Sequence, residues 1–244
     1  MDHVRGIDQY TLHSEVFYNS LGDTLDKSQL QLPVITGNGQ HNHQEGGYIR
    51  FRWDRTFPEQ SSLWLQAAYD RNQYQLLPYS KYNAESVDID FQHNFPLLEK
   101  HNFTWGAHYR ANHNKVFTTE VITLNPQQKT THFFSGFIRN DFALIPDHIL
   151  FTLGIRLDHN DFTGLEIQPN TRLMWTPDSK NSIWMAVSRA VRTPSRTEID
   201  GLYNLGSASG SSIQGIPQLP IPILTTLEGN RNFNSEKLLA YELG

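Results

Sequence analysis

The chain has 244 residues, of which 38% are hydrophobic and 18% are charged, and its formal net charge is −5. It contains no run near the roughly 20 apolar residues that a membrane-spanning helix needs, which excludes a helical membrane protein. The negative charge, with Lys and Arg scattered among Asp and Glu, predicts no nucleic-acid partner. Because cysteine is absent, a disulfide scaffold, a Cys-ligated metal and a Cys nucleophile are excluded.

Amphipathic β segments follow one another along the chain. Apolar and polar residues alternate with a period of two, the pattern of a strand with two different faces. Such segments occur at 9–18, 48–54, 63–70, 87–92, 103–110, 134–139, 149–158, 171–175, 183–188 and 238–243. We therefore predict about ten strands, many of them near the 9–11 residues that cross a bilayer at a tilt.

Short Pro-marked turns alternate with longer polar connections. The short turns lie at 57–60, 96–99, 145–148 and 177–180, and the longer connections lie at 74–83, 114–130, 159–164 and 193–235. Transmembrane β-barrels keep short turns at the periplasmic side and long loops at the outside. The fold class predicted is all-β, an antiparallel transmembrane β-barrel segment.

The two faces of these strands are suited to different surroundings. One face carries Ile, Leu, Val and Phe, as contact with outer-membrane lipid requires. The other carries charged side chains, which we predict to face the lumen: Arg50, Arg52, Asp88, Asp90, Arg110, Arg156 and Arg172. A soluble antiparallel sheet with one wet face is the alternative reading of the same alternation. Strand length and the succession of hairpins favour the barrel.

Three stretches resemble TonB-dependent outer-membrane receptors. The first is Trp175–Ser195, in which Ser188, Arg192, Pro194 and Ser195 match a Ser-x-x-x-Arg-x-Pro-Ser strand exit. The second is Glu228–Gly244, which ends in Tyr-Glu-Leu-Gly but carries Arg231 and Phe233 where Pro and Leu are usual. The third, Gly46–Arg71, is similar to the mid-barrel hairpins of the family. Together the resemblance covers roughly residues 45–244.

This resemblance implies a barrel of about 22 strands whose lumen is filled by a plug domain, with uptake driven by the TonB complex. The start of the chain lacks an export signal, and its end reads as mid-strand. We therefore expect residues 1–244 to be an internal, partial receptor barrel without the plug domain and the closing C-terminal strands. Its expected location is the Gram-negative outer membrane.

The resemblance implies an importer of a scarce small molecule, such as an iron–siderophore complex, without catalytic residues or a cofactor. We expect ligand contacts in the connections 74–83, 114–130 and 193–235. The side chains best suited to stacking on a ligand are Tyr74, Tyr79, Tyr82 and Tyr203. The Gly- and Ser-rich connection 193–235 is expected to be mobile without a partner. An outer-membrane barrel enzyme and a soluble all-β binding module are the alternative functions.

Neither of two paired sets of polar residues predicts a metal site or an acid–base pair. His41 and His43 lack a third ligand, and zinc sites need at least three protein ligands. Asp88 and Asp90 fall in the regular polar face of a strand, where lining a lumen accounts for them. We predict no metal site and no catalytic site.

Overall fold

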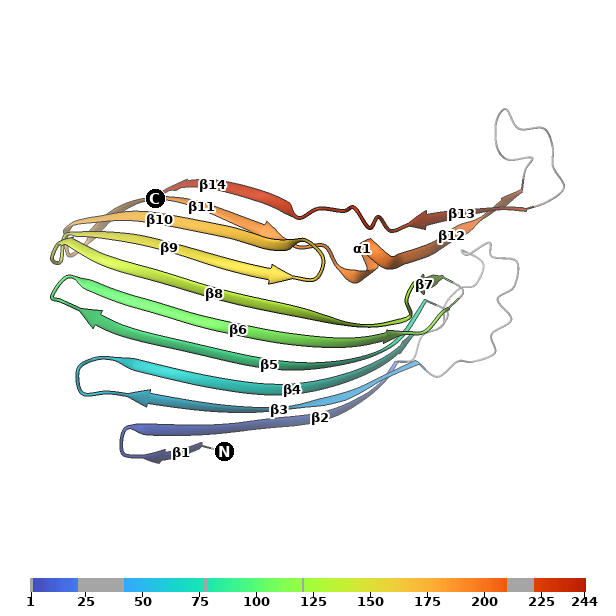
Figure 1. Ribbon diagram of the computed structural model, residues 1–244, viewed down its shortest axis with the longest axis horizontal. Helices are drawn as coiled ribbons and strands as arrows, with labels where there is room; N and C mark the ends of the chain where they lie inside the picture. Colours follow the sequence, from blue (N-terminus) through green and yellow to red (C-terminus); the bar gives the residue numbers. More distant parts are fainter. Residues whose placement is uncertain (1, 22–41, 77–78, 120, 210–221) are drawn as a thin grey trace.

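The computed structural model describes residues 2–21, 42–76, 79–119, 121–209 and 222–244, which form two antiparallel sheets (Figure 1). The large sheet consists, in spatial order, of β1 (Asp2–Arg5), β2 (Asp8–Leu21), β3 (Asn42–Thr56), β4 (Ser62–Leu76), β5 (Ser80–Leu97), β6 (His101–Val116), β8 (Gln128–Ile145), β9 (Ile149–Asn160), β10 (Gly164–Asp178), β11 (Asn181–Arg192) and β14 (Glu236–Leu243). The small sheet consists of β13 (Pro222–Glu228), β12 (Gly201–Ser209) and β7 (Ile122–Leu124). The short helix α1 (Arg196–Asp200) precedes β12.

Consecutive strands of the large sheet pair as hairpins in a long meander. The β5–β6 pair, for example, runs without a register shift from Tyr82↔Val116 to Leu97↔His101. Short turns join the strands at one end of the sheet, at the left in Figure 1. Three of these turns place a residue in the left-handed region, namely Gln60, Leu98 and Asp147 with φ of 59°, 60° and 62°. The small sheet and α1 lie at the opposite end, which we call the loop end (Figure 1).

All ten predicted strands are present, and the antiparallel all-β fold class is confirmed. The sequence pattern missed β1, β7, β12, β13 and α1. Two of the predicted longer connections are wrong, because β4 continues to Leu76 before β5 begins at Ser80, and β9 ends at Asn160 before β10 begins at Gly164. The connection 193–235 is not a featureless loop either, since it carries α1, β12 and β13.

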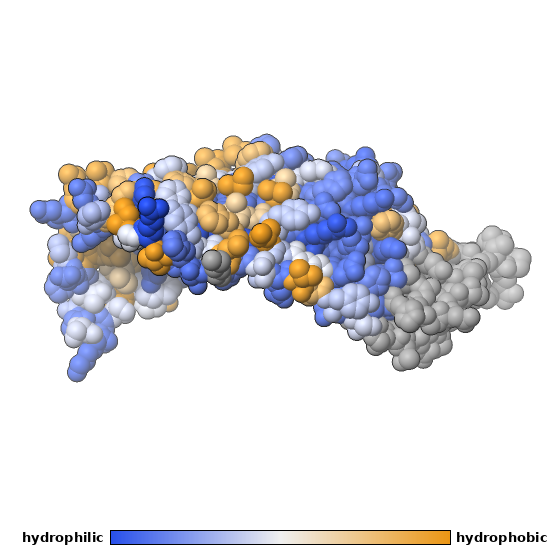
Figure 2. Space-filling view, turned by 90° about the horizontal axis from the view of Figure 1, so that it is seen from below, coloured by the Kyte–Doolittle hydropathy of each residue, from blue (hydrophilic) through white to orange (hydrophobic). Residues whose placement is uncertain are grey.

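The large sheet has no packed interior of its own. Large apolar side chains on one of its faces are exposed, including Phe51 at 43%, Ile89 at 44% and Leu153 at 56%. Among the described residues, the buried hydrophobic side chains are Ile122, Leu124 and Ile199, which all belong to β7 and α1 at the loop end. In the view of Figure 2, hydrophobic side chains gather over the part away from the loop end, and hydrophilic ones dominate near it. No helix in the described part of the chain is long and apolar enough to cross a membrane.

Candidate functional site

The register places all seven residues that were predicted to face the lumen on one face of the large sheet. Arg50, Ala68, Asp88 and Arg110 are successive cross-strand partners in β3 to β6. Directly opposed residues of an antiparallel pair lie on the same face. Arg52 and Asp90 lie one step along the same face, and Arg156 and Arg172 continue it on β9 and β10. We call this surface the polar face; its contact with a lumen stays a prediction.

Carboxylates of the polar face are paired with neighbouring cations. Arg52, Arg139 and Arg156 each bind the Asp two residues further along the same strand, at 2.6, 2.8 and 2.8 Å. Asp88 accepts from Arg110 Nε at 2.9 Å and lies 2.8 Å from His108 Nε2. Each of these pairs compensates the charge of both of its members.

The group Asp88, Asp90 and His108 resembles a cation site in its spacing, since one ligand atom from each lies within 4.8 Å of the others. Arg110 donates to both carboxylate oxygens of Asp88 at 2.9 Å, however. A cation would have to displace this guanidinium, which already supplies the positive charge. We therefore assign the group to the ion pairs of the polar face.

The four tyrosines predicted to contact a ligand lie in different settings near the loop end. Tyr74 of β4 and Tyr82 of β5 are cross-strand partners on the polar face, and their ring centroids lie 5.4 Å apart. Tyr79 lies in the turn between these strands. Tyr203 of β12 donates from its hydroxyl to Thr197 O at 3.4 Å. Three of them thus belong to strands and not to loops, which corrects their predicted setting; ligand contact by all four stays a prediction.

The histidines at 41 and 43 differ in what the structure describes. His41 lies outside the described residues. His43 belongs to β3, and its ring stacks on Tyr18 with centroids 6.2 Å apart.

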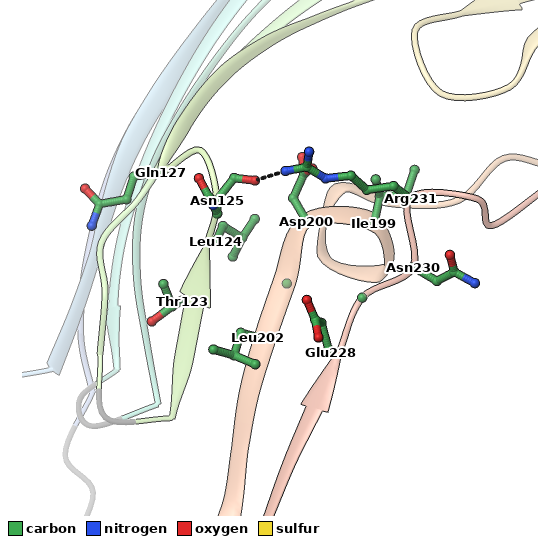
Figure 3. Close-up of a pocket in the computed structure, with 12 residues that line it drawn as sticks. Thr123, Leu124, Asn125, Gln127, Ile199, Asp200, Leu202, Glu228, Asn230 and Arg231 are labelled. Carbon is green, nitrogen blue, oxygen red and sulfur yellow. Dashed lines mark hydrogen bonds and ion pairs between the residues drawn. The ribbon is translucent and has the colours of Figure 1, made fainter.

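A cleft of about 830 Å³ lies at the loop end, lined by β7 and the residues that follow it, by the junction of α1 and β12, and by the end of β13 (Figure 3). Its polar lining residues are Thr123, Asn125 and Gln127 on one side and Asn230 on the other. Arg231, which is 69% exposed, reaches across the cleft and donates to Asn125 O at 3.2 Å (Figure 3). We call this feature the loop cleft; it was not visible in the sequence, because its two walls are more than 70 residues apart.

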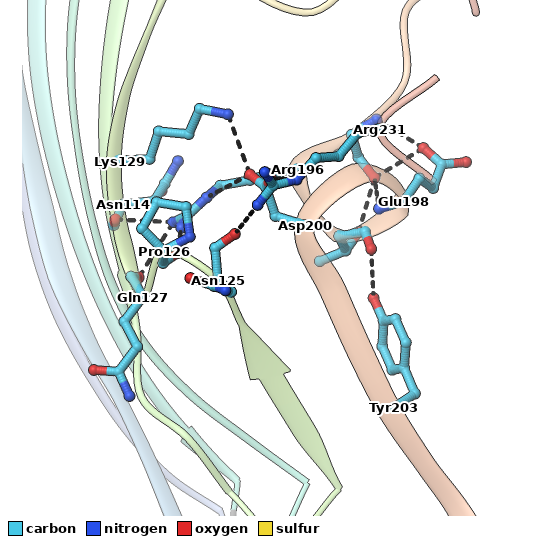
Figure 4. A network of polar contacts seen from close by, with 12 residues as sticks. Asn114, Asn125, Pro126, Gln127, Lys129, Arg196, Glu198, Asp200, Tyr203 and Arg231 are labelled. Atoms are coloured by element: carbon cyan, nitrogen blue, oxygen red, sulfur yellow. Dashed lines mark hydrogen bonds and ion pairs between the residues drawn. The ribbon is translucent and has the colours of Figure 1, made fainter. Parts of the chain in front are cut away.

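The wall of the loop cleft is held by a buried carboxylate, that of Asp200, whose side chain is 3% exposed (Figure 4). Lys129 Nζ, Arg196 Nε and Arg231 Nε lie 3.2, 3.7 and 3.9 Å from its oxygens. Lys129 and Arg196 compensate the charge of Asp200 without lining the cleft themselves. The exposed guanidinium of Arg231 can donate to carboxylate, phenolate or carbonyl oxygens of a ligand.

Arg196 of α1 links the connection between β11 and β14 to β6 and the connection that follows β6. Its Nη1 donates to Asn114 O at 3.1 Å and to Gln127 O at 3.3 Å, and its Nη2 donates to Pro126 O (Figure 4). The backbone adds Asn125 N donating to Asp200 O at 3.0 Å and Asn204 N donating to Val121 O at 2.8 Å. The connection between β6 and β8 and the connection between β11 and β14 are thus bound into one unit.

A second ion cluster closes the base of the connection between β11 and β14. Arg192 Nη2 donates to Glu198 Oε1 at 2.8 Å and to Glu236 Oε1 at 2.7 Å. Glu198 also accepts from Ser195 N at 2.7 Å, while Ser195 Oγ accepts from Glu198 N, so the pair forms a capping box at the start of α1. The bonds from Arg192 and then those from Ser195 lower the pKa of Glu198 to about 2.

Part of this site had a sequence signal that was not used. The Ser195-x-x-Glu198 spacing is that of a capping box and could have predicted α1. The buried Arg196 and Asp200 had no such signal, because their partners come from a distant connection. Arg192 was recognised as part of the strand exit, but its two carboxylate partners were not.

Solved structures similar to this chain are siderophore receptors. The siderophore receptor PirA from Pseudomonas aeruginosa is 20% identical, with a TM-score of 0.67, and the match covers 83% of this chain and 36% of that one. The ferric enterobactin receptor PfeA from the same organism, in complex with BCV-L6, is 15% identical, with a TM-score of 0.70, and the match covers 99% and 38%. PirA from Acinetobacter baumannii is 16% identical, with a TM-score of 0.63, over 83% and 32%.

At these identities the likeness shows the fold, and the chain spans well under half the length of each of these receptors. The comparison with curated proteins gave no match. The family model described as TonB dependent receptor-like, beta-barrel matches residues 5–244, nearly the whole chain. The chain therefore belongs to the TonB-dependent receptor β-barrel family.

Proposed function

We propose that this chain is part of an outer-membrane receptor that imports a siderophore-class ligand with energy from the TonB complex. The observation that carries the proposal is the family match over residues 5–244. The similar solved structures, which are siderophore receptors, support the same ligand class. A plug domain and a TonB-contacting segment elsewhere in the full-length receptor are part of this proposal.

The described surface is suited to such a role in two ways. The outward face of the large sheet is apolar and exposed, as lipid contact requires, while the opposite face carries paired charges. The loop cleft presents Arg231 and several amides at the end where an external ligand would arrive. We propose that Arg231, with Tyr74, Tyr79, Tyr82 and Tyr203, makes the ligand contacts, because aromatic rings and a guanidinium bind a flat, anionic chelate well.

The proposal is tested by iron uptake in cells. Strains that carry the full-length receptor, a deletion of it, or a deletion of TonB would be supplied with radioactive iron as a tris-catecholate or as a tris-hydroxamate complex. We expect at least tenfold lower uptake of one of these complexes in both deletion strains. Equal uptake in all three strains, with either complex, would refute the transport function.

Arg231→Gln tests the loop cleft within this function. Because the substitution keeps hydrogen-bonding groups but removes the charge, we expect weaker binding of the anionic catecholate complex by about tenfold, equivalent to about 1.4 kcal/mol. Lys180→Gln, in the turn at the opposite end, is the matched control and should bind as the parent does. Unchanged binding in Arg231→Gln would remove the cleft from the ligand path.

A further inference from the structure

A hollow of about 380 Å³ lies on the outward, apolar face of the large sheet, across β5, β6, β8, β9 and β10. Its floor is formed by two small residues, Ala107 and Gly136, which are direct cross-strand partners. Its walls include Phe91, Phe134, Leu157 and Leu165. Phe91 is the partner of Ala107, and Leu157 is the partner of Gly136, so large apolar side chains flank the floor on both sides.

The floor of the hollow is open to the outside. A Cβ atom at Gly136 would meet only Gly106 O, 3.9 Å away. A Cβ atom at Gly106, which belongs to the polar face, would lie 2.6 Å from the Phe137 ring. The sheet is therefore filled on its polar face at this point and left unfilled on its apolar face.

Polar groups gather where the hollow meets the loop end. The Tyr109 hydroxyl, on its rim, lies 3.0 Å from His132 Nδ1. His159, also on the rim, is exposed and is the cross-strand partner of Leu165. The hollow is thus apolar along its length and carries a hydroxyl and two imidazoles at one end. This arrangement matches a lipid molecule, in which an apolar acyl chain is joined to a hydrogen-bonding headgroup.

We propose that this hollow binds one acyl chain of a lipid from the leaflet at the loop end, with the headgroup against Tyr109, His132 and His159. The proposal rests on the outer-membrane location in the proposed function. Continuity with the apolar surface favours a lipid as the occupant, because the hollow is surrounded by the side chains that lipid would already contact. The rim groups can donate to the oxygens of a phosphate or sugar headgroup.

The test is native mass spectrometry of the full-length receptor, extracted from outer membranes in a mild detergent. Ala107→Leu fills the hollow from its floor. Ala67→Leu is the matched control, since Ala67 lies on the same face of β4, is exposed and does not line the hollow. We expect the parent and Ala67→Leu to retain one lipid, and Ala107→Leu to retain it at least tenfold less. His159→Ala should retain the lipid less than the parent does.

Three outcomes would overturn the proposal. The first is equal lipid retention in Ala107→Leu and Ala67→Leu. The second is a photo-cross-linker at Leu157 that captures a polypeptide in place of a lipid. The third is a receptor that needs no detergent, which would refute the membrane location too. Ala107→Leu should transport iron as the parent does. Iron uptake separates the two claims, because a parent receptor that transports iron but retains no lipid refutes the lipid site and leaves the proposed function intact.

Discussion

Arg196 and Asp200 are the two residues on which the loop end depends most. Their side chains are 8% and 3% exposed, so water contributes little to solvating either charge. Removing one partner of a buried ion pair costs more than an exposed pair would, because the other charge is left without compensation. Arg196 also donates to the carbonyl group of Asn114 in β6 and to those of Pro126 and Gln127 in the connection between β6 and β8.

Arg196→Met should loosen this connection by about 3 kcal/mol, the lower end of the cost of breaking a buried pair. Hydrogen exchange of the amides over 114–129 and 196–201 measures the effect, and protection there should fall by about a hundredfold. Arg71→Met is the control, since the Arg71 side chain is 52% exposed and its Nε lies 3.7 Å from Glu85 Oε1 on the large sheet. Unchanged protection in Arg196→Met would mean that Arg196 does not hold the two connections together.

Glu198 makes the start of α1 sensitive to acid. Its pKa is lowered from 4.5 to about 2, so the ionised form is favoured in the folded state. A lowered carboxyl pKa contributes stability above the unfolded value and loses it as the pH falls toward the folded value. The capping box and the bond to Arg192 should therefore weaken between about pH 4.5 and pH 2.

Pepsin, which is active over that range, provides the measurement. We expect cleavage within 193–209 to rise steeply as the pH falls from 4.5 to 2, relative to cleavage elsewhere in the receptor. Glu198→Gln cannot ionise, so its cleavage there should be high at every pH in the range. A parent protein whose relative cleavage stays flat would contradict the role of Glu198.

At the scale of elements, the short strand β7 determines how the loop end is built. It pairs with β12 through Gly201↔Leu124, Leu202↔Thr123 and Tyr203↔Ile122. Leu124 is 2% exposed and Ile199 of α1 is 7% exposed, so the small sheet has the packed apolar centre that the large sheet lacks. Burial of a few side chains therefore joins two connections that are distant in sequence.

Leu124→Ala should separate β7 from β12, because truncating a buried Leu costs about 3 kcal/mol. Gln127→Cys and Thr225→Cys provide two positions for spin labels, and this chain has no native cysteine that would compete for the label. The distance distribution between them should broaden in Leu124→Ala. In Leu227→Ala, whose side chain is 57% exposed on β13, it should stay narrow. Equal distributions in both variants would show that Leu124 does not hold the small sheet.

The elements also show how far the sequence predicts this structure. The period-two alternation predicts strands such as β5 and β9 directly. Each face of these strands has one kind of surroundings, so apolar and polar residues alternate along the sequence. The polar face follows from the same pattern, and the register brings Asp88 beside Arg110 as the antiparallel order requires. β7, with three residues, is too short for a period to appear, and β12 is rich in Gly and Ser. The loop cleft depends on their pairing, so it could not be predicted locally.

At the scale of the whole molecule, the two faces of the large sheet are suited to opposite surroundings, one apolar and one polar. Phe51, Ile89 and Leu153 are exposed on the apolar face, and contact with apolar surroundings would be more favourable for them than contact with water. The polar face behind them tolerates charge, because Asp and Arg alternate along and across its strands. A new charge should therefore have a different cost on each face.

Phe51→Arg should destabilise the receptor by about 2–4 kcal/mol, the cost of a cation near the bilayer midplane on the lipid face of a barrel. Gln66→Arg places the same charge on the polar face, between its cross-strand partners Asp90 and Arg52, the latter already paired with Asp54, and should cost far less. Urea unfolding of the receptor in lipid vesicles compares the two. Equal destabilisation would mean that the assignment of the faces is wrong.

The cross-strand pairing of Arg192 with Glu236 has a consequence for the segment between them. This segment leaves the large sheet after Arg192 and re-enters it at Glu236, so it begins and ends at one cross-strand residue pair. Residues can therefore be inserted or lost within it without shifting the register of β11 on β14, as long as α1 and β12 keep their contacts with the connection between β6 and β8. The large sheet thus imposes no length on this segment, whereas the small sheet constrains the part that pairs with β7.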